Sequence, residues 1–285
     1  MLLKAILTTI IIIILCYLLA IMPKLKRNRN IKGMDGWLYA HRGLHNNKSD
    51  APENSLKAFG LAVEKGYGIE LDVQLTKDQV PIVLHDYHLK RVCHIEVQVS
   101  TLTYEELQKY RLFGSQERIP TLKEVLELVD GRVPLIIELK LPWKAEPLCS
   151  TVAELLRGYK GFYVIESFNP FGLMWYRKHH PEVIRGQLST DFIKEKIDGD
   201  PIQYFLLKHL LMNFLTKPDF IAYHHVYKNA LSFTLCRKLF RTKPVAWTIQ
   251  SEEQLEKSKE YYDLFIFDGF DPKGMQILHH VKVKV

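Results

Sequence analysis

Cysteine is scarce in this sequence, and its scarcity excludes two classes of protein. Only four of the 285 residues are cysteine, and no two of them form a Cys-x-x-Cys pair. Neither a disulfide framework nor a zinc site is expected, and reduced thiols in a cytosolic body are the simplest interpretation. Internal repeats and low-complexity segments are also missing, which excludes solenoids and propellers. The remaining composition, 47% hydrophobic and 25% charged, is that of an ordinary globular protein.

Net positive charge is small outside one end of the chain. The formal net charge is +7, and residues 1–36 account for +5 of it, because they hold six Lys or Arg residues and one Asp. The rest of the chain therefore carries only +7 − 5 = +2. Nucleic acid is not an expected partner, since the net positive charge is concentrated beside an apolar segment and not on the folded body.

An uncharged apolar run, residues 5–22, is long enough to cross a membrane. Its 18 residues would span about 27 Å as a helix. We predict that residues 1–36 form a single transmembrane anchor followed by a basic linker. A cleaved signal peptide is the alternative, but the run is long for one, only Lys4 precedes it, and no small-x-small site stands before Pro23.

The flanking charges predict the orientation of this anchor. One basic residue precedes the run and five follow it within residues 24–32. By the positive-inside rule, the remainder of the chain then lies in the cytoplasm, held at the cell membrane. The same basic stretch can also rest on anionic headgroups, at about 1 kcal/mol for each Lys or Arg.

From Trp37 onward, short apolar runs alternate with helical patterns. The expected strands are residues 37–40, 68–73, 82–84, 135–139, 162–165, 184–188, 220–223, 244–247 and 264–267. Among the helices, residues 55–65 follow Asn54 as N-cap, and residues 122–129 follow a capping box of Thr121 and Glu124. Such alternation predicts an α/β fold with a parallel sheet. About eight units in about 250 residues predict a (β/α)8 TIM barrel over residues 37–285.

One of the nine strands is surplus to an eight-stranded barrel. The connection from Thr76 to Gln79 is too short for a parallel crossover, which needs about a dozen residues. We therefore expect a hairpin that pairs residues 82–85 with residues 68–73, with opposed positions summing to about 155–157. This pairing would return His85 to the level of Glu70 and Asp72.

Charged residues follow several of the predicted strands, at the end where barrel enzymes carry their active sites. Glu70 and Asp72 are two residues apart on one strand and so point to the same face. Converging carboxylates suit a hard cation such as Mg²⁺ or Ca²⁺. Histidine can exchange protons near neutral pH. Each signal is weak alone, but their common placement predicts one active site. Its candidate residues are His41-Arg42, Glu53, Glu70, Asp72, His85-Asp86, Glu138 and Lys140.

These motifs resemble the glycerophosphodiester phosphodiesterase family, within a superfamily of barrel phosphodiesterases that includes phosphatidylinositol-specific phospholipase C. The matching segments are Ala40-His41-Arg42-Gly43, Pro52-Glu53-Asn54-Ser55, GIELDVQLTKD at 68–78, VLHD at 83–86, IPTL at 119–122 and IELK at 137–140. Weaker agreement continues to Asp268. With its predicted N-terminal anchor, the chain is similar to a membrane-anchored, bacterial-type member of this family. Departures at Asp263-Leu264 and Gln250 bear on substrate shape and leave the chemistry intact.

The resemblance implies a role for each matching residue. The general base and acid would be His41 and His85. One divalent metal ion, Mg²⁺ or Ca²⁺, would be held by Glu70, Asp72 and Glu138. The phosphate would be contacted by Arg42 and Lys140. Glu53 would orient Arg42 or meet a glycerol hydroxyl.

The implied activity is the metal-dependent hydrolysis of glycerophosphodiesters to glycerol 3-phosphate and an alcohol, by way of a cyclic phosphate. One alternative is lysophospholipase D or phospholipase C-like action on membrane lipids. An alternative of another class is a catalytically inactive, membrane-tethered binding module. None of the motif residues is missing, and this favours an enzyme.

Two further features complete these expectations. Residues 205–215 are strongly apolar and predict a barrel helix packed on the core, with a lipid-facing helix as the alternative. His224 and His225 follow a strand and could line the barrel mouth, whereas His45 is expected to be a solvated loop residue.

Overall fold

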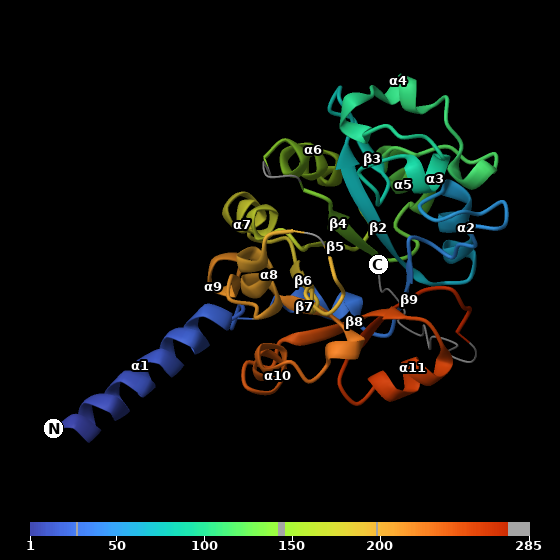
Figure 1. The fold of residues 1–285 in the computed structure, drawn as a ribbon. Coiled ribbons are helices and arrows are strands. Elements are labelled where there is room, and N and C mark those ends of the chain that lie inside the picture. The colour runs from blue at the N-terminus through green and yellow to red at the C-terminus, as the bar shows by residue number, and fades with distance from the viewer. Residues whose placement is uncertain (27, 142–145, 198, 273–285) are drawn as a thin grey trace.

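A computed structural model of the chain describes residues 1–26, 28–141, 146–197 and 199–272 (Figure 1). Its strands form one sheet in the order β1-β9-β8-β7-β6-β5-β4-β2-β3, and a further pairing of β1 with β2 closes it. Eight strands are parallel, so the predicted (β/α)8 barrel is confirmed. The strands are β1 (Leu38–His41), β2 (Gly68–Leu75), β3 (Pro81–Val83), β4 (Leu135–Leu139), β5 (Tyr163–Ser167), β6 (Arg185–Ser189), β7 (Phe220–His224), β8 (Lys243–Ile249) and β9 (Leu264–Phe267).

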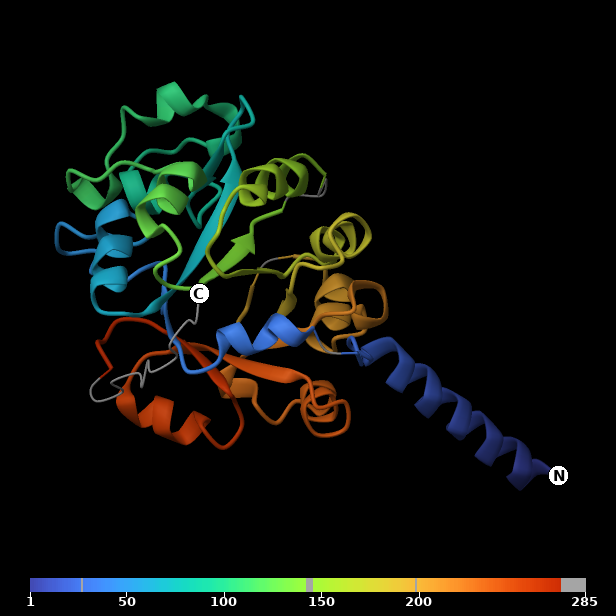
Figure 2. The ribbon, with the colours of Figure 1, turned by 180° about the vertical axis from the view of Figure 1, so that it is seen from behind.

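Helices surround this barrel (Figure 2). The larger ones are α2 (Leu56–Glu64), α5 (Leu122–Val129), α6 (Glu146–Arg157), α7 (Pro170–His179), α8 (Pro201–Lys208), α10 (Leu231–Lys238) and α11 (Glu252–Ser258). Short elements fill the connections: α3 (Lys90–Cys93), α4 (Tyr104–Leu107), α9 (Asn213–Thr216) and the 3₁₀ turns η1 (Arg29–Met34), η2 (Val99–Thr101), η3 (Leu112–Gly114) and η4 (His225–Tyr227).

The predicted hairpin is confirmed. Strand β3 pairs antiparallel with β2, and opposed positions such as Val73 and Val83 sum to 156. The backbone N–H of Leu84 then donates to the carbonyl of Asp72 at 2.9 Å. The chain therefore reaches His85 beside the polar end of β2.

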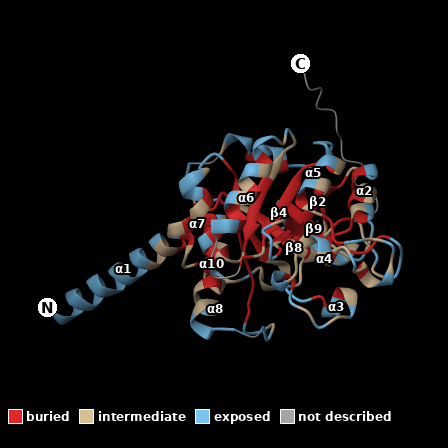
Figure 3. Cartoon of the chain, turned by 90° about the horizontal axis from the view of Figure 1, so that it is seen from above, coloured by how far each residue is buried: buried red, intermediate tan, exposed pale blue. Residues whose placement is uncertain are grey.

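The interior of the barrel has an apolar floor and a polar mouth. Because side chains alternate along a strand, Tyr39, Ile136 and Val164 point inward and fill the lower half. Met34 and Ile31 of η1 close this floor, although they belong to the segment predicted as a basic linker. Figure 3 shows this buried interior inside a more exposed shell. The polar side chains are thereby confined to the open end.

One predicted cap is wrong and another is confirmed. Ser55, not Asn54, caps α2, because its hydroxyl accepts from the backbone N–H of Ala58 at 3.1 Å. Asn54 instead has a left-handed backbone and turns its side chain into the site. The capping box of Thr121 and Glu124 opens α5 as predicted.

Residues 205–215 do not form one helix. Helix α8 ends at Lys208 and α9 begins at Asn213, with Leu210 between them in the left-handed region at a φ of +55°. The hydroxyl of Tyr223 donates to the carbonyl of Lys208 at 3.0 Å, which satisfies a group that a continuous helix would have used. Leu207 and Leu210 are buried as expected, but Phe205 is half exposed.

Helix α1 (Leu2–Ile21) projects from the side of the barrel (Figures 1 and 2). Its residues are exposed except toward its C-terminal end, where Ile21 is buried. By length and composition it could cross a membrane, with a mean hydropathy of 2.6. An anchor and a signal sequence both fit this finding.

Candidate active site

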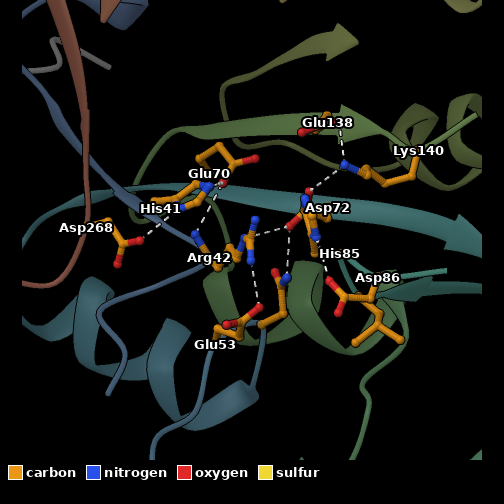
Figure 4. A network of polar contacts seen from close by, with 12 residues as sticks. His41, Arg42, Glu53, Glu70, Asp72, His85, Asp86, Glu138, Lys140 and Asp268 are labelled. Carbon is orange, nitrogen blue, oxygen red and sulfur yellow. Dashed lines mark hydrogen bonds and ion pairs between the residues drawn. The ribbon is translucent and has the colours of Figure 1, made fainter. Parts of the chain in front are cut away.

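The site begins with a tight turn after β1. The backbone N–H of Arg42 donates to the carbonyl of Glu70 at 2.9 Å, and its carbonyl accepts from Asn54 at 2.9 Å. Arg42 and Gly43 both have positive φ values, and a Cβ on Gly43 would lie 2.9 Å from the backbone of Ala58. Glycine is therefore required here. The turn leaves the His41 side chain over the mouth and folds that of Arg42 beneath it (Figure 4).

The three predicted metal ligands converge on one face of two paired strands, β2 and β4. Asp72 of β2 lies opposite Glu138 of β4, and Glu70 is two residues before Asp72 on the same face. Each offers a carboxylate oxygen within 4.8 Å of the others, and all three residues are buried. Such a group could hold a metal ion.

The carboxylates differ in their electrostatic surroundings. Burial and the neighbouring charge of Asp72 raise the pKa of Glu70 well above its ordinary value. Burial alone would also raise the pKa of Asp72, but the charges around it hold that pKa far below its usual range. The groups that contact Asp72 are Arg42 through Nε at 3.3 Å, Lys140 through Nζ at 3.7 Å and Asn54 through Nδ2 at 3.0 Å.

Lys140 extends the site away from the histidines. Its ammonium is 3.0 Å from Glu138 as well as 3.7 Å from Asp72. The side chain also lines a neighbouring cavity, together with Gln74 and Tyr87. The structure thus places Lys140 against Glu138 and Asp72, on the side of the site where the neighbouring cavity lies.

Each of the two predicted histidines has a carboxylate at its Nδ1 atom. For His41 the partner is Asp268 at 3.2 Å, and for His85 it is Asp86 at 2.7 Å. Because an ionised carboxylate only accepts hydrogen bonds, Nδ1 of each ring carries a proton, and Nε2 is the nitrogen left to take up or give a proton on the cavity side. Nε2 of His41 faces Glu70 at 3.9 Å. Burial and the charge of Arg42 lower the pKa of His41, and the contact with Asp268 opposes this shift.

Glu53 lies behind this arrangement and holds Arg42 in place. Its carboxylate accepts from Arg42 at 2.7 Å, from both terminal nitrogens of Arg91 and from Asn47. Burial alone would raise the pKa of Glu53, but Arg91 and Arg42 lower it to about 2. Arg91 also binds Asp86, the partner of His85. These are the contacts of a residue that orients Arg42, the first of its two predicted roles.

The site opens into a small cavity of about 160 Å³. Its polar lining includes His41, Glu70, His85 and Glu138. Its apolar lining includes Phe168, Leu188, Trp247 and Ile266. The cavity can therefore enclose a small ligand that has both charged and carbon-rich parts.

Several residues of the site were not predicted from the sequence. Asp268 follows β9, far along the chain from His41, and the predicted solvated His45 is its second partner, at 3.0 Å through Nε2. His45 is therefore mostly buried by this contact, and the prediction for it is wrong. Glu166 of β5 is register-paired with Glu138 and lines the cavity. It is 1% exposed, and its Oε2 has no hydrogen-bond partner among the described residues. His224 lies beside Trp247 at the mouth, as expected.

Comparisons with known proteins agree with this geometry. The model of the glycerophosphoryl diester phosphodiesterase family matches residues 41–267. A glycerophosphodiester phosphodiesterase of Caldanaerobacter subterraneus is 38% identical over 162 residues, which are 52% of this chain and 65% of that protein. A lysophospholipase D of Rattus norvegicus is 36% identical over 134 residues, 42% of this chain and 41% of that protein.

Solved structures give the same result for the fold. A phosphodiesterase of Oleispira antarctica, in complex with the product sn-glycerol-3-phosphate, matches with a TM-score of 0.65 and 26% identity. The match covers 81% of this chain and 92% of that one. The similarity therefore extends over almost the whole barrel.

Proposed function

The chain belongs to the glycerophosphoryl diester phosphodiesterase family, and from this premise we propose that it hydrolyses glycerophosphodiesters to glycerol 3-phosphate and an alcohol. The observation that carries the proposal is the convergence of three buried carboxylates beside two oriented histidines in one cavity. Acid–base residues next to a cation site suit the cleavage of a phosphodiester, which gains negative charge as it reacts.

The donor set fits one hard divalent cation. Three buried carboxylates with oxygens within 4.8 Å of one another repel strongly unless a cation lies among them. Oxygen ligands suit Mg²⁺ or Ca²⁺. Glu70, Asp72 and Glu138 would hold the ion, which would supply Lewis-acid polarisation of a phosphate oxygen and a template for the substrate.

The histidines then divide the proton transfers. Nε2 of His41 takes the proton of the substrate's 2-hydroxyl, and the freed oxygen bonds to phosphorus while the bond to the alcohol breaks. His85 gives its Nε2 proton to the departing alcohol oxygen, leaving a cyclic glycerol phosphate. Water opens the ring with the roles reversed, so both histidines return to their starting states.

The positively charged side chains of the site would bind the phosphate of the substrate. Arg42 lines the cavity and is held by Glu53, so its fixed charge can meet the phosphoryl oxygens. Lys140 adds a second positive charge beside Glu138. The apolar lining of Phe168 and Trp247 would receive the carbon side of the glycerol unit.

Glycerophosphocholine tests this proposal. The full chain with Mg²⁺ or Ca²⁺ should release glycerol 3-phosphate and choline, and His41→Ala or His85→Ala should lower turnover by about 10²–10⁴-fold. A simple aryl phosphodiester in the same assay separates an enzyme from an inactive binding module. Cleavage of neither compound with either metal would overturn the proposal.

Lysophospholipids are a second candidate substrate class. The apolar lining of the cavity and the exposed apolar residues of the barrel surface, such as Phe205, favour a diester that carries an acyl chain. The rat relative named above is a lysophospholipase D. Comparing turnover of glycerophosphocholine with that of lysophosphatidylcholine decides between the two classes.

We also propose that residues 1–36 anchor the enzyme as a single-pass protein, with residues 37–285 as the phosphodiesterase unit in the cytoplasm. The support is the length and apolar character of α1 and the basic residues that follow it. Resistance of the full chain to alkaline extraction, and the sidedness of its protease cleavage in vesicles, test the anchor and its orientation.

A further inference from the structure

The exposed apolar side chains of the barrel are gathered on one side. Outside residues 1–21, eleven large apolar residues of the described chain are exposed, and eight of them lie between residues 193 and 239. We call these eight the apolar face: Ile193, Ile197, Ile202, Phe205, Phe214, Val226, Leu231 and Leu239. They come from the loop after β6, from α8 and α9, from η4 and from α10 and its C-cap. A patch of this kind marks a surface that contacts a partner or a membrane.

Helix α1 joins the barrel on this same side. The carbonyl of Ile21 accepts from Nδ2 of Asn213 in α9 at 2.9 Å and from Sγ of Cys236 in α10 at 3.3 Å. Tyr17 and Leu18 also pack against the barrel core. The last turns of α1 are thus part of the folded body, and Figure 1 shows the helix leaving it beside α9.

The residues after α1 are also held against the body. Nζ of Lys217 donates to the carbonyl of Met22 at 3.1 Å. Lys24 pairs with the buried Asp219 at 3.0 Å, and Asn28 donates to the carbonyl of Glu182 at 2.9 Å. A chain tied at these points is not a flexible tether. The membrane that holds α1 therefore meets one defined side of the barrel.

Charge around the apolar face is mainly positive. Exposed basic residues of this region are Lys194, Lys196, Lys238 and Arg241. Of the acidic residues described there, Asp191 and Asp219 are buried and paired with lysines, which leaves Asp200 exposed and Glu195 partly exposed. Apolar side chains among basic ones are typical of surfaces that rest on anionic lipid headgroups.

A row of aromatic rings connects this surface to the active-site cavity. Trp247 in the cavity wall contacts Phe168 at 5.5 Å, and Phe168 contacts Phe192 in the loop after β6 at 5.8 Å. Phe192 stacks on Tyr204 of α8 at 4.7 Å, between the exposed Ile202 and Phe205. The row links the cavity wall to the apolar face through contacts between aromatic side chains.

We infer that the apolar face lies in the headgroup region of the bilayer that holds α1, and that the enzyme takes lysophospholipids from that leaflet. The inference rests on the proposed anchor and the proposed diester hydrolysis. The bilayer is the occupant because α1, an exposed apolar helix, leaves the body from this side and places the lipid surface next to it.

Lipid contact can be measured without any catalytic assay. The full chain, with Cys16 and Cys93 replaced by serine, carries one environment-sensitive fluorophore at Phe205→Cys or at Lys123→Cys, a control position on α5. Each protein is reconstituted in vesicles of phosphatidylcholine and phosphatidylglycerol that contain a spin-labelled quencher lipid. We expect the label at position 205 to be quenched and blue-shifted and the label at position 123 to remain unquenched. Equal fluorescence at the two positions would overturn the inference.

A matched pair of variants tests the substrate consequence. Ile202→Asp/Phe205→Asp removes two apolar side chains and changes the net charge by −2, and the control Lys123→Asp also changes it by −2. We expect the double variant to cleave vesicle-borne lysophosphatidylcholine about tenfold more slowly or worse, because each lost apolar insertion is worth roughly that factor. Its turnover of dissolved glycerophosphocholine and both activities of the control should be unchanged. Equal lysolipid turnover in the two variants would contradict the lipid route.

These outcomes separate the inference from its premises. If alkaline extraction releases the protein, the anchor fails and the inference fails with it. If α1 stays in the membrane but position 205 is unquenched, only the apolar face is refuted. If neither soluble nor lipid diesters are cleaved, the proposed function fails, whatever the quenching shows.

Discussion

Asp268 offers a sharp test of how the site works, because it touches a proposed catalytic residue and no metal ligand. One carboxylate oxygen accepts from Nδ1 of His41 at 3.2 Å, and the other lies 3.0 Å from Nε2 of His45 as an ion-pair contact. In Asp268→Asn the shape is retained, but one oxygen becomes an amide nitrogen that donates. Only one of the two histidines can then keep an oxygen as its partner.

The expected loss follows from the tautomer of His41. An amide N–H that points at Nδ1 stabilises the ring with its proton on Nε2, which is the wrong nitrogen for a general base facing the cavity. Replacing the orienting carboxylate of a catalytic histidine costs up to about 10⁴ in kcat in serine proteases. General acid–base catalysis is worth about 10²–10⁴-fold. We therefore expect kcat to fall by about 10²–10⁴, or roughly 3–5 kcal/mol of transition-state stabilisation.

The pH profile gives this prediction a second, independent readout. Burial and Arg42 lower the pKa of His41, and Asp268 raises it. Without the carboxylate the pKa of His41 falls further, so the acidic limb of the kcat/KM profile, which reports the essential base, should move to lower pH. Metal affinity should be unchanged, because the carboxylate group of the metal site does not include Asp268.

The assay is steady-state cleavage of glycerophosphocholine across pH, with metal binding measured separately by calorimetry. His45→Gln is the matched control, since it removes the other partner of Asp268 and leaves the His41 contact in place. We expect a much smaller loss for this control. Normal kcat in Asp268→Asn, or a loss explained by weaker metal binding, would refute the proposed role of His41.

The remaining predictions concern the metal, the charge network and a helix cap. Burial and mutual repulsion raise the pKa values of Glu70 and Glu138, so protons compete with the metal for these carboxylates, and deprotonation of the carboxylates destabilises the metal-free fold as pH rises. A fixed metal concentration of 100 times the Kd at pH 8 should therefore add up to about 2.7 kcal/mol to the unfolding free energy near pH 8, and less near pH 5. Calorimetric scans measure this increment, and an increment independent of pH would contradict the prediction. Glu53→Gln should lower the unfolding free energy at pH 7 by about 3 kcal/mol, the low end for a broken buried ion pair because Arg91 is partly exposed. Since the folded pKa of Glu53 is lowered to about 2, its stabilisation is present above about pH 4 and is lost as pH falls toward 2, so denaturant titrations should show the two proteins converging in acid. Ser55→Ala should cost about 1 kcal/mol in the same titrations, and a neutral result would show that the cap contributes nothing.

Much of the barrel could be predicted because its strands are buried on both faces. The predicted strands 135–139 and 264–267 match β4 and β9 residue for residue. Each is a buried apolar run followed by a charged residue, so the sequence defines where the strand ends. The hairpin could also be predicted, because four residues cannot make a parallel crossover. Glu70, Asp72 and Glu138 followed from their places at strand ends.

The features that could not be predicted depend on contacts between distant parts of the chain. Asp268 reaches His41 across 227 positions, and nothing near either residue signals the pair. Asn54 and Ser55 are both good N-caps, and the choice between them is made by Asp72, which takes the Asn54 amide. The break at Leu210 contains no glycine or proline, and tertiary hydrogen bonds to the Lys208 carbonyl accompany it.

In the proposed reaction, a single cation held by Glu70, Asp72 and Glu138 is required for phosphodiester cleavage. The most direct test is to titrate Mg²⁺ or Ca²⁺ into chelator-treated full-length protein and to measure the rate on glycerophosphocholine at each step. We expect no turnover without metal and a rate that rises in proportion to the occupancy of one site. Full activity in the chelator-treated protein, or a rate that does not follow that occupancy, would contradict it.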